Sequence, residues 1–195
     1  AVTAVGTHFV EVESMEELEA AYSERTAMIF IFGDAADRGP ISVKDMAASG
    51  HAHGVPTFVD AAAERPDAPN CYLEDGVDAV AYSGGKCLRG PQASGLVLGR
   101  EDLLKAAFLN GCPHGSIGRP MKVGKEEIMG LLAAVEQWVV RDHKAEWKEW
   151  ERRLSVITEA MNAFDTVEAN TRQPGRSNVA PHLSIKWDAE QLGVS

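Results

Sequence analysis

Residues that could perform catalysis gather in one short stretch of this sequence. The apolar run Val77–Tyr82 is followed directly by Ser83, Gly84, Gly85 and Lys86. A lysine that ends a buried strand between glycines can be partly desolvated, which lowers its pKa and frees its amine for Schiff-base chemistry. The Ser83 hydroxyl and backbone N–H could bind a phosphate, which the two glycines would let approach closely. The alternative is a glycine-rich turn with a surface lysine, and this stretch alone favours neither reading.

A second chemical group ends the preceding apolar stretch, where Asp60 follows Val55–Val59. If both stretches are strands of one sheet, Asp60 and Lys86 emerge at the same carboxyl edge, where open α/β folds bind ligands. An aspartate there can pair with a protonated ring nitrogen, as a pyridoxal phosphate ring requires. Ala61 and Ala62 are small enough to lie against a flat ring. The alternative is that Asp60 caps the N-terminus of a helix. The presence of Lys86 after the next strand makes this alternative less favoured than the cofactor role.

Alternating strands and helices must position these side chains. We expect helices over 15–23 and 43–53, with Ser14 and Ser42 as N-caps and Gly54 as the C-terminal stop. Buried strands are expected over 27–32, 55–60, 77–82 and 95–99, and the alternation over 7–12 suggests an opening strand. This order predicts an α/β fold with a mostly parallel, doubly wound sheet.

The pattern changes in the last third of the chain. Long helical periodicity runs from Gly124 to about Ile157, with a break near 141–143, and two strands are expected over 163–171 and 179–187. The expected domains are therefore a partial large domain over 1–122, long connecting helices over 123–162, and the start of a small α+β domain over 163–195.

Composition limits the classes of partner. The 195 residues carry 19 basic and 29 acidic side chains, a formal net charge of −10, which argues against a nucleic-acid partner. No apolar run approaches the ~20 residues that a membrane span needs. The three cysteines, Cys71, Cys87 and Cys112, lack the spacing of a zinc site or a disulfide framework. We expect a cytoplasmic protein with no metal, no membrane and no nucleic-acid partner.

Four sequence motifs resemble a known family. They are Val55-Pro-Thr-Phe-Val-Asp-Ala-Ala62, Gly76-Val-Asp-Ala-Val-Ala-Tyr-Ser-Gly-Gly-Lys86, Gly90-Pro-Gln-Ala-Ser-Gly95 and Gly118-Arg-Pro-Met-Lys-Val-Gly-Lys-Glu126. Together they resemble fold type I pyridoxal-phosphate enzymes, within them the selenocysteine-synthase-like and D-glucosaminate-6-phosphate ammonia-lyase-like group. The resemblance covers most of residues 6–140 and implies the large domain of that fold.

The resemblance assigns roles to individual residues. It implies that Lys86 is the catalytic Schiff-base lysine, that Asp60 pairs with the ring nitrogen, that Ala62 packs on the ring and that Ser83 contacts the phosphate. Arg119 and Lys122 match its last motif and could bind a substrate carboxylate or phosphate, although solvated loop cations are an equal alternative.

The implied function is that of a pyridoxal-phosphate-dependent lyase. It would eliminate a β-substituent from an amino acid or amino sugar acid, in a homodimer or higher homo-oligomer with shared active sites. An aminotransferase or aldolase would use the same lysine and aspartate. Selenium transfer to tRNA is disfavoured by the acidic charge.

The family's first strand, first helix and phosphate-cradling loop have no counterpart here, so we expect an internal piece of a longer protein. The alternative is a non-catalytic subunit or fragment.

Neighbouring reactive residues are expected to have structural roles. We expect Cys87 to be a small core residue, His51 and His53 to close a helix, and His114 to lie at the surface. We expect the tryptophans of the long helices to be core or subunit-contact residues.

Overall fold

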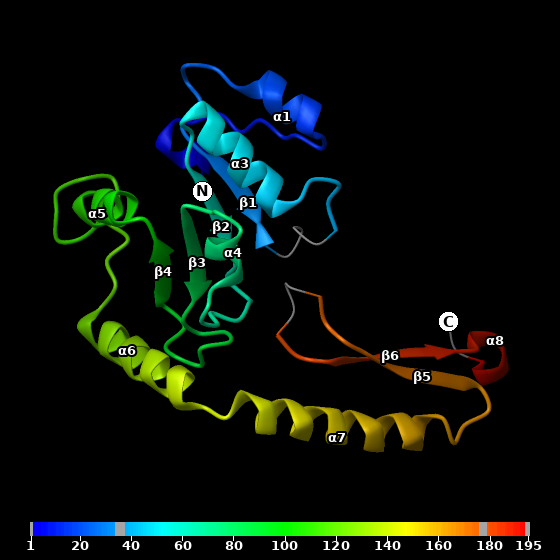
Figure 1. Ribbon diagram of the computed structural model, residues 1–195. Helices are drawn as coiled ribbons and strands as arrows, with labels where there is room; N and C mark the ends of the chain where they lie inside the picture. Colours follow the sequence, from blue (N-terminus) through cyan, green and yellow to red (C-terminus); the bar gives the residue numbers. More distant parts are fainter. Residues whose placement is uncertain (1, 34–37, 176–178, 194–195) are drawn as a thin grey trace.

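The computed structural model describes residues 2–33, 38–175 and 179–193, and contains a four-stranded sheet, a long helical segment and a separate hairpin (Figure 1). Its elements in chain order are η1 (Val2–Val5), α1 (Met15–Ala21), β1 (Ile29–Phe32), α3 (Val43–His53), β2 (Thr57–Asp60), α4 (Cys71–Glu74), β3 (Ala79–Ser83), β4 (Gly95–Gly99), α5 (Glu101–Asn110), α6 (Lys125–Val140), α7 (His143–Met161), β5 (Val167–Arg172), β6 (His182–Trp187) and α8 (Ala189–Leu192).

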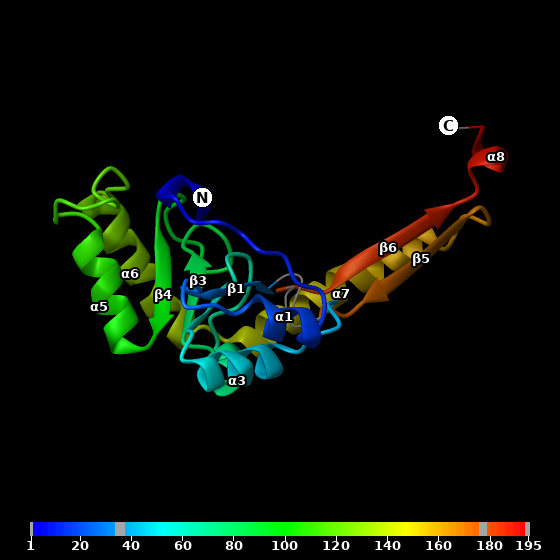
Figure 2. The same ribbon diagram turned by 90° about the horizontal axis from the view of Figure 1, so that it is seen from above.

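The sheet has the order β1-β2-β3-β4, with the first three strands parallel and β4 antiparallel to β3. The two connecting helices α3 and α4 lie on the same side of it (Figures 1 and 2). Right-handed crossovers that step in one direction across a sheet produce this arrangement. The mostly parallel α/β sheet expected from the sequence is confirmed, and the antiparallel β4, which the sequence did not reveal, makes it mixed.

The core lies between the sheet and α3. Ile29, Ile31 and Val59 point to this side and are buried with Val43 and Ala47 of the helix. The caps form as the sequence predicts: Ser14 and Ser42 accept hydrogen bonds from the amides of Glu17 and Asp45. Gly54 ends α3 in the left-handed conformation at φ 68°, which glycine adopts without strain.

The expected opening strand over 7–12 is wrong. These residues form no strand, and Val10 is exposed. Phe9 packs edge-on against Phe30, with ring centroids 6.3 Å apart. Since Phe30 alternates with the core residues Ile29 and Ile31, it points to the opposite face of the sheet. Side-chain packing on that face explains the alternating pattern without strand pairing.

Beyond the sheet, α6 and α7 meet at a two-residue break at Arg141 and Asp142, as expected from the sequence. Strands β5 and β6 pair antiparallel and pack on α7. Figure 2 shows this helix and hairpin extending away from the sheet. Within the described residues, no helix combines the length and the apolarity that crossing a membrane requires.

Candidate active site

Backbone pairing at the carboxyl ends of β2 and β3 brings three of the expected site residues together. Asp60 is in register with Ala81. Beyond it, the amide of Ser83 donates to the carbonyl of Ala62 at 3.1 Å, and the amide of Ala61 donates to the carbonyl of Ala81 at 2.9 Å. Asp60, Ala62 and Ser83 therefore stand side by side at one edge of the sheet, and Lys86 follows three residues later.

Asp60 ends β2 as a half-buried carboxylate. Its Oδ1 accepts a hydrogen bond from the amide of Ala62 at 3.1 Å, so the carboxylate is held by the turn that follows the strand. This turn does not continue into a helix, which excludes the helix N-cap role. Among the described residues, that amide is the only hydrogen-bond donor to this carboxylate, so it retains acceptor capacity for a ligand.

Lys86 lies in the turn between β3 and β4, and its side chain is exposed. The expectation that this lysine is partly desolvated is wrong for these 195 residues. The turn is closed by hydrogen bonds from the Gly90 amide to the Gly84 carbonyl at 2.7 Å and from the Arg89 amide to the Lys86 carbonyl at 3.0 Å. The backbone is thus fixed, while the amine remains in solvent.

The two glycines before Lys86 serve packing within the chain. A Cβ at Gly84 would stand 2.0 Å from Ser94 Oγ and 3.0 Å from Leu131 Cδ1, and one at Gly85 would stand 2.5 Å from Gln92 Oε1. Their missing side chains therefore make room for other residues of this chain. The Ser83 amide already donates a hydrogen bond to the Ala62 carbonyl. Of the phosphate-binding groups expected here, only the Ser83 hydroxyl therefore remains a candidate.

Arg119 and Lys122 lie elsewhere. Both are exposed in the loop between α5 and α6, and Arg119 Nη1 donates to Cys112 Sγ at 2.9 Å. The Lys86 turn instead contacts the middle of α6, where Leu131 and Ala134 approach Gly84 and Gly90. Among the described residues, neither cation makes a hydrogen bond or ion pair with the Lys86 turn.

The cysteine beside Lys86, the histidines that end α3 and the first tryptophan of the long helices have structural roles, as expected. Cys87 packs against the core, and burial raises its pKa to about 11. Trp138 is buried. His51 and His53 contact the carboxylates of Asp78 and Glu19. His114 is half-buried rather than on the surface, because its ring packs edge-on against Phe108.

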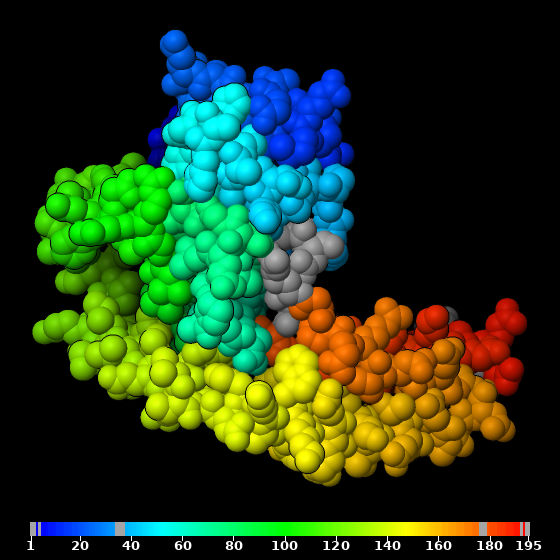
Figure 3. All heavy atoms as spheres, viewed as in Figure 1, coloured from blue at the N-terminus to red at the C-terminus, as the bar shows by residue number. Residues whose placement is uncertain are grey.

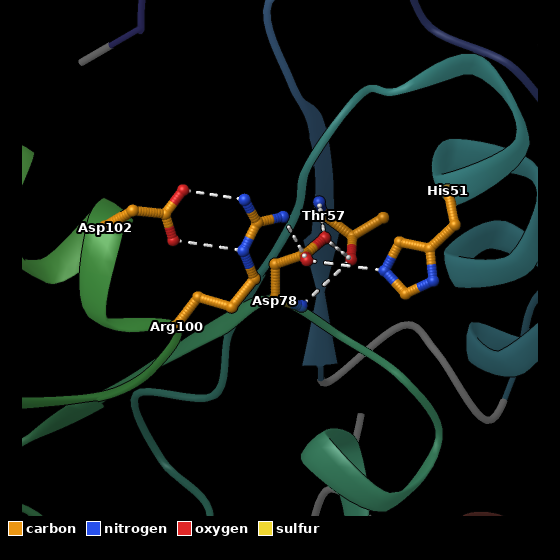
Figure 4. Close-up of polar contacts among 5 residues, drawn as sticks. All are labelled: His51, Thr57, Asp78, Arg100 and Asp102. Carbon is orange, nitrogen blue, oxygen red and sulfur yellow. Dashed lines mark hydrogen bonds and ion pairs between the residues drawn. The ribbon is translucent and has the colours of Figure 1, made fainter.

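Sequence reasoning missed a polar network at the opposite, amino edge of the sheet (Figure 4). The buried carboxylate of Asp78 accepts hydrogen bonds from the Thr57 amide at 2.7 Å, the Thr57 hydroxyl at 3.1 Å and Arg100 Nη1 at 2.7 Å. Burial alone would raise the pKa of Asp78, but the hydrogen bonds from Arg100 and Thr57 lower it below its ordinary value. The sequence signal was an aspartate directly before a buried strand. This network ties β2, β3 and β4 together on the edge away from Lys86.

Comparisons with known proteins place the chain in a family. The model of the aminotransferase class-V family matches residues 7–116. D-glucosaminate-6-phosphate ammonia lyase of Salmonella typhimurium (strain 14028s / SGSC 2262) is 29% identical over 97% of this chain and 51% of its own length. 5'-C-glycyluridine monooxygenase-decarboxylase of a Streptomyces species is 32% identical over 97% of this chain and 48% of its own length.

A solved structure of D-glucosaminate-6-phosphate ammonia-lyase superposes with a TM-score of 0.69 at 28% identity, covering 97% of this chain and 50% of that one. The chain thus spans about half the length of the relatives it matches. Because the family model covers more than half of the 195 residues and includes Asp60, Ala62, Ser83 and Lys86, the chain belongs to the aminotransferase class-V family.

Proposed function

We propose that the protein to which this chain belongs is a pyridoxal-phosphate-dependent lyase that eliminates a β-substituent from an amino acid or amino sugar acid. Class-V aminotransferases and the related ammonia lyase are pyridoxal-phosphate enzymes. The single observation that carries the proposal is the hydrogen-bonded carboxyl edge of β2 and β3. This edge presents the Asp60 carboxylate beside the Ser83 hydroxyl, and the exposed amine of Lys86 follows Ser83 by three residues.

The side chains at this edge fit the cofactor chemically. A carboxylate with remaining acceptor capacity suits a protonated ring nitrogen, a hydroxyl suits a phosphate, and a primary amine suits an aldehyde. When bound, pyridoxal phosphate stabilises negative charge at the α-carbon of the substrate. Asp60 would hold the proton on the ring nitrogen, Ala62 would lie against the ring, and Ser83 would donate to the phosphate.

Lys86 would supply the acid-base chemistry. Its amine would remove the proton from the α-carbon of the substrate as a general base. Departure of a β-substituent then leaves an unsaturated amine, which water converts to a keto acid and ammonia. Elimination as the outcome is supported by the ammonia-lyase relative, and amino transfer remains the alternative that the family name supports.

A borohydride experiment tests the role of Lys86. The 195-residue chain is incubated with saturating pyridoxal phosphate, reduced, digested and analysed by mass spectrometry. We expect one phosphopyridoxyl group at Lys86, none in Lys86→Ala, and an unchanged yield in Lys122→Ala, which removes an equally exposed lysine. Equal labelling of Lys86 and the other surface lysines would contradict the proposal.

The reaction type is tested on the full-length protein with candidate amino acids and amino sugar acids. Elimination predicts stoichiometric release of ammonia and keto acid with no added keto-acid acceptor. Formation of a new amino acid only when an acceptor keto acid is present would instead establish an aminotransferase.

The assignment of residues 1–122, 123–162 and 163–195 to a large domain, connecting helices and the start of a small domain is part of the same proposal. It is supported by the separation of the four-stranded sheet from the β5–β6 hairpin by α6 and α7. A cytoplasmic location is supported by the three cysteines, none of which forms a disulfide with another, since disulfides are rare in reducing compartments. A small-molecule amino substrate follows from the family, and a homodimer or higher homo-oligomer completes the proposal.

A further inference from the structure

The loop after Asp60 contains a buried glutamate that the proposed function does not use. Glu64 follows Asp60 by four residues, and only 3% of its surface is exposed. Carboxylates are rarely buried to this extent unless they are paired. Its Oε2 accepts a hydrogen bond at 2.6 Å from the hydroxyl of Tyr72 in α4, and Tyr72 is itself fully buried. Figure 3 shows the segment that contains α4, in teal-green, between the cyan helix α3 and the yellow start of α7.

The end of β1 leaves space for this carboxylate. Gly33 directly follows β1. A Cβ at this position would overlap Glu64 Oε1 and would stand 2.9 Å from the Tyr72 hydroxyl. The carbonyl oxygen of Asp60 would lie 3.1 Å from the same Cβ. The carboxylate, the phenol and the backbone of Asp60 therefore surround one point at the carboxyl edge of the sheet.

Hydrogen bonds connect Glu64 to the carboxylate of Asp60. The Glu64 amide donates to the Ala61 carbonyl at 2.9 Å, which closes the turn after β2. Within that turn, the Ala62 amide is the group that donates to Asp60 Oδ1 at 3.1 Å. The orientation of the Asp60 carboxylate therefore depends on a turn whose last residue is fixed by a buried side chain.

Glu64 acts from the side of the sheet that faces away from the proposed cofactor groups. Its partner Tyr72 belongs to the core between the sheet and α3, together with Val59. Asp60 follows Val59 in β2, so its side chain points to the other face of the sheet. Glu64 can therefore affect the carboxylate of Asp60 through the turn, without touching a cofactor or a substrate itself.

We propose that Glu64 is a positioning residue that, through its hydrogen bond with Tyr72, holds the carboxylate of Asp60 where it meets the ring nitrogen of the cofactor. The inference rests on the proposed function and adds a residue to its cofactor site. Groups that bind a ligand precisely need neighbours that lock them by packing and hydrogen bonds. Without the Tyr72 hydroxyl, a buried carboxylate oxygen loses its donor, which is costly, and the turn is expected to shift so that water can replace it.

Titration of the full-length protein with pyridoxal phosphate, followed by the near-visible absorbance of the bound cofactor, tests the proposal. Tyr72→Phe removes only the hydroxyl that donates to Glu64. We expect this variant to bind about tenfold more weakly, the lower end of what outer hydrogen-bond partners contribute at metal sites. Gly33→Ala, which displaces the same carboxylate, should show a similar loss. The control Tyr22→Phe removes a phenol hydroxyl that is hydrogen-bonded to Ser49 at 2.7 Å, and should stay within twofold of wild type.

A cofactor analogue separates the positioning of Asp60 from a general loss of structure. In the deaza analogue of pyridoxal phosphate a C–H group replaces the ring nitrogen, so the carboxylate of Asp60 has no partner on the ring. Tyr72→Phe should therefore bind this analogue as well as wild type does. In addition, Asp60→Asn/Tyr72→Phe should bind pyridoxal phosphate no more weakly than Asp60→Asn alone, because both changes remove the same interaction.

The outcomes separate this inference from the proposed function. Equal losses of affinity for pyridoxal phosphate and for the deaza analogue in Tyr72→Phe would show a merely structural role and overturn the inference. A wild-type affinity of Tyr72→Phe for pyridoxal phosphate would overturn it as well, and both results leave the proposed function in place. A wild-type protein that acquires no absorbance band at saturating pyridoxal phosphate would refute the proposed function, and with it the role of Glu64.

Discussion

At the level of single residues, the sequence predicts that the glycines before Lys86 leave space for a phosphate. The structure shows that they leave space for other side chains of this chain. Their spacing suggested room for a phosphate, but the space beside Gly84 is taken by Ser94 and Leu131. Glycine is required there because two segments of the same chain approach each other closely. The turn that carries Lys86 is therefore positioned by packing against α6.

Replacing Gly84 by alanine should destabilise the protein. The new Cβ would overlap Ser94 Oγ, and overpacking of this kind costs about 1–3 kcal/mol. Urea unfolding followed by circular dichroism measures the loss. Gly115→Ala is the matched control, because nothing lies within 4 Å of its Cβ position. An unfolding free energy of Gly84→Ala equal to that of the control would contradict the packing role.

Replacing Asp78 by asparagine should also destabilise the protein, in a pH-dependent way. The change removes the charge that Arg100 and Thr57 stabilise, and we expect a loss of about 2 kcal/mol at pH 7. Because the pKa of Asp78 is lowered in the folded state, its contribution is complete above the unfolded pKa of about 3.9 and declines as the pH falls through the folded value. The difference between wild type and variant should therefore shrink below pH 4.

Asp102→Asn is the control for this pH profile, since Asp102 pairs with the same guanidinium but is exposed. Exposed ion pairs are screened by solvent and contribute little to stability, so we expect a much smaller loss for this variant. Equal losses for the two variants at pH 7 would show that burial of Asp78 is unimportant.

At the scale of elements, α6 connects the Lys86 turn to the rest of the fold. Ala134 and Trp138 are its buried residues, and Ala134 lies against Gly90 of that turn. The guanidinium groups of Arg65 and Arg141 lie 5.1 and 5.4 Å from the Trp138 ring centre. The helix is thus fixed by one aromatic ring that contacts the loop after β2.

Truncating that ring should have a large effect. Trp138→Ala is expected to cost about 3–5 kcal/mol, because it removes a buried aromatic side chain and leaves a cavity. Thermal or urea unfolding measures the change. Gln137→Ala, at the neighbouring exposed position, should alter stability by less than about 0.5 kcal/mol. A similarly small loss for Trp138→Ala would show that α6 is held elsewhere.

The helices and strands that could be predicted are those marked by residues within or next to the element itself. Ser14, Ser42 and Gly54 mark helix ends by their own chemistry, and the apolar strands before Asp60 and Ser83 have the composition of buried parallel strands. The shared edge of Asp60 and Ser83 followed from strand order alone.

The remaining features depend on partners that no local pattern specifies. Helix α5 escaped detection because it has neither a side-chain N-cap nor a buried residue. The alternation around Phe9 reflects packing against Phe30 and not strand pairing. The position of Arg119 relative to Lys86 depends on where α6 docks, which the sequence of that loop does not encode.

At the scale of the whole molecule, α6 has a second apolar face. Ile128, Met129, Leu132, Val139 and Val140 are exposed. At ~3.6 residues per turn they occupy about one third of the helix circumference, beside the face that carries Trp138, and the exposed Lys125 and Glu136 lie within the same third. A helix that is apolar on two sides is usually covered on both, which supports the proposed homodimer with a second copy on this face.

Sedimentation velocity tests the dimer. We expect the wild-type chain to sediment as a dimer at micromolar concentrations and Met129→Glu/Val139→Glu to sediment as a monomer, because a charge on each side would be desolvated in the interface. Gln137→Glu, on the polar side of α6, should remain dimeric. A monomeric wild-type chain, or a dimeric double variant, would refute this assignment of the face.

The junction at Arg141 and Asp142 divides the molecule into two parts with very different amounts of buried surface. Beyond it, α7 has no buried residue, and Ala169 and Pro181 are the only buried residues among those described after residue 142. With so little buried apolar surface, α7 and the hairpin should open as a separate cooperative unit at a lower free energy than the sheet. Backbone amides after residue 143 should therefore exchange with deuterated solvent well before those of β2 and β3.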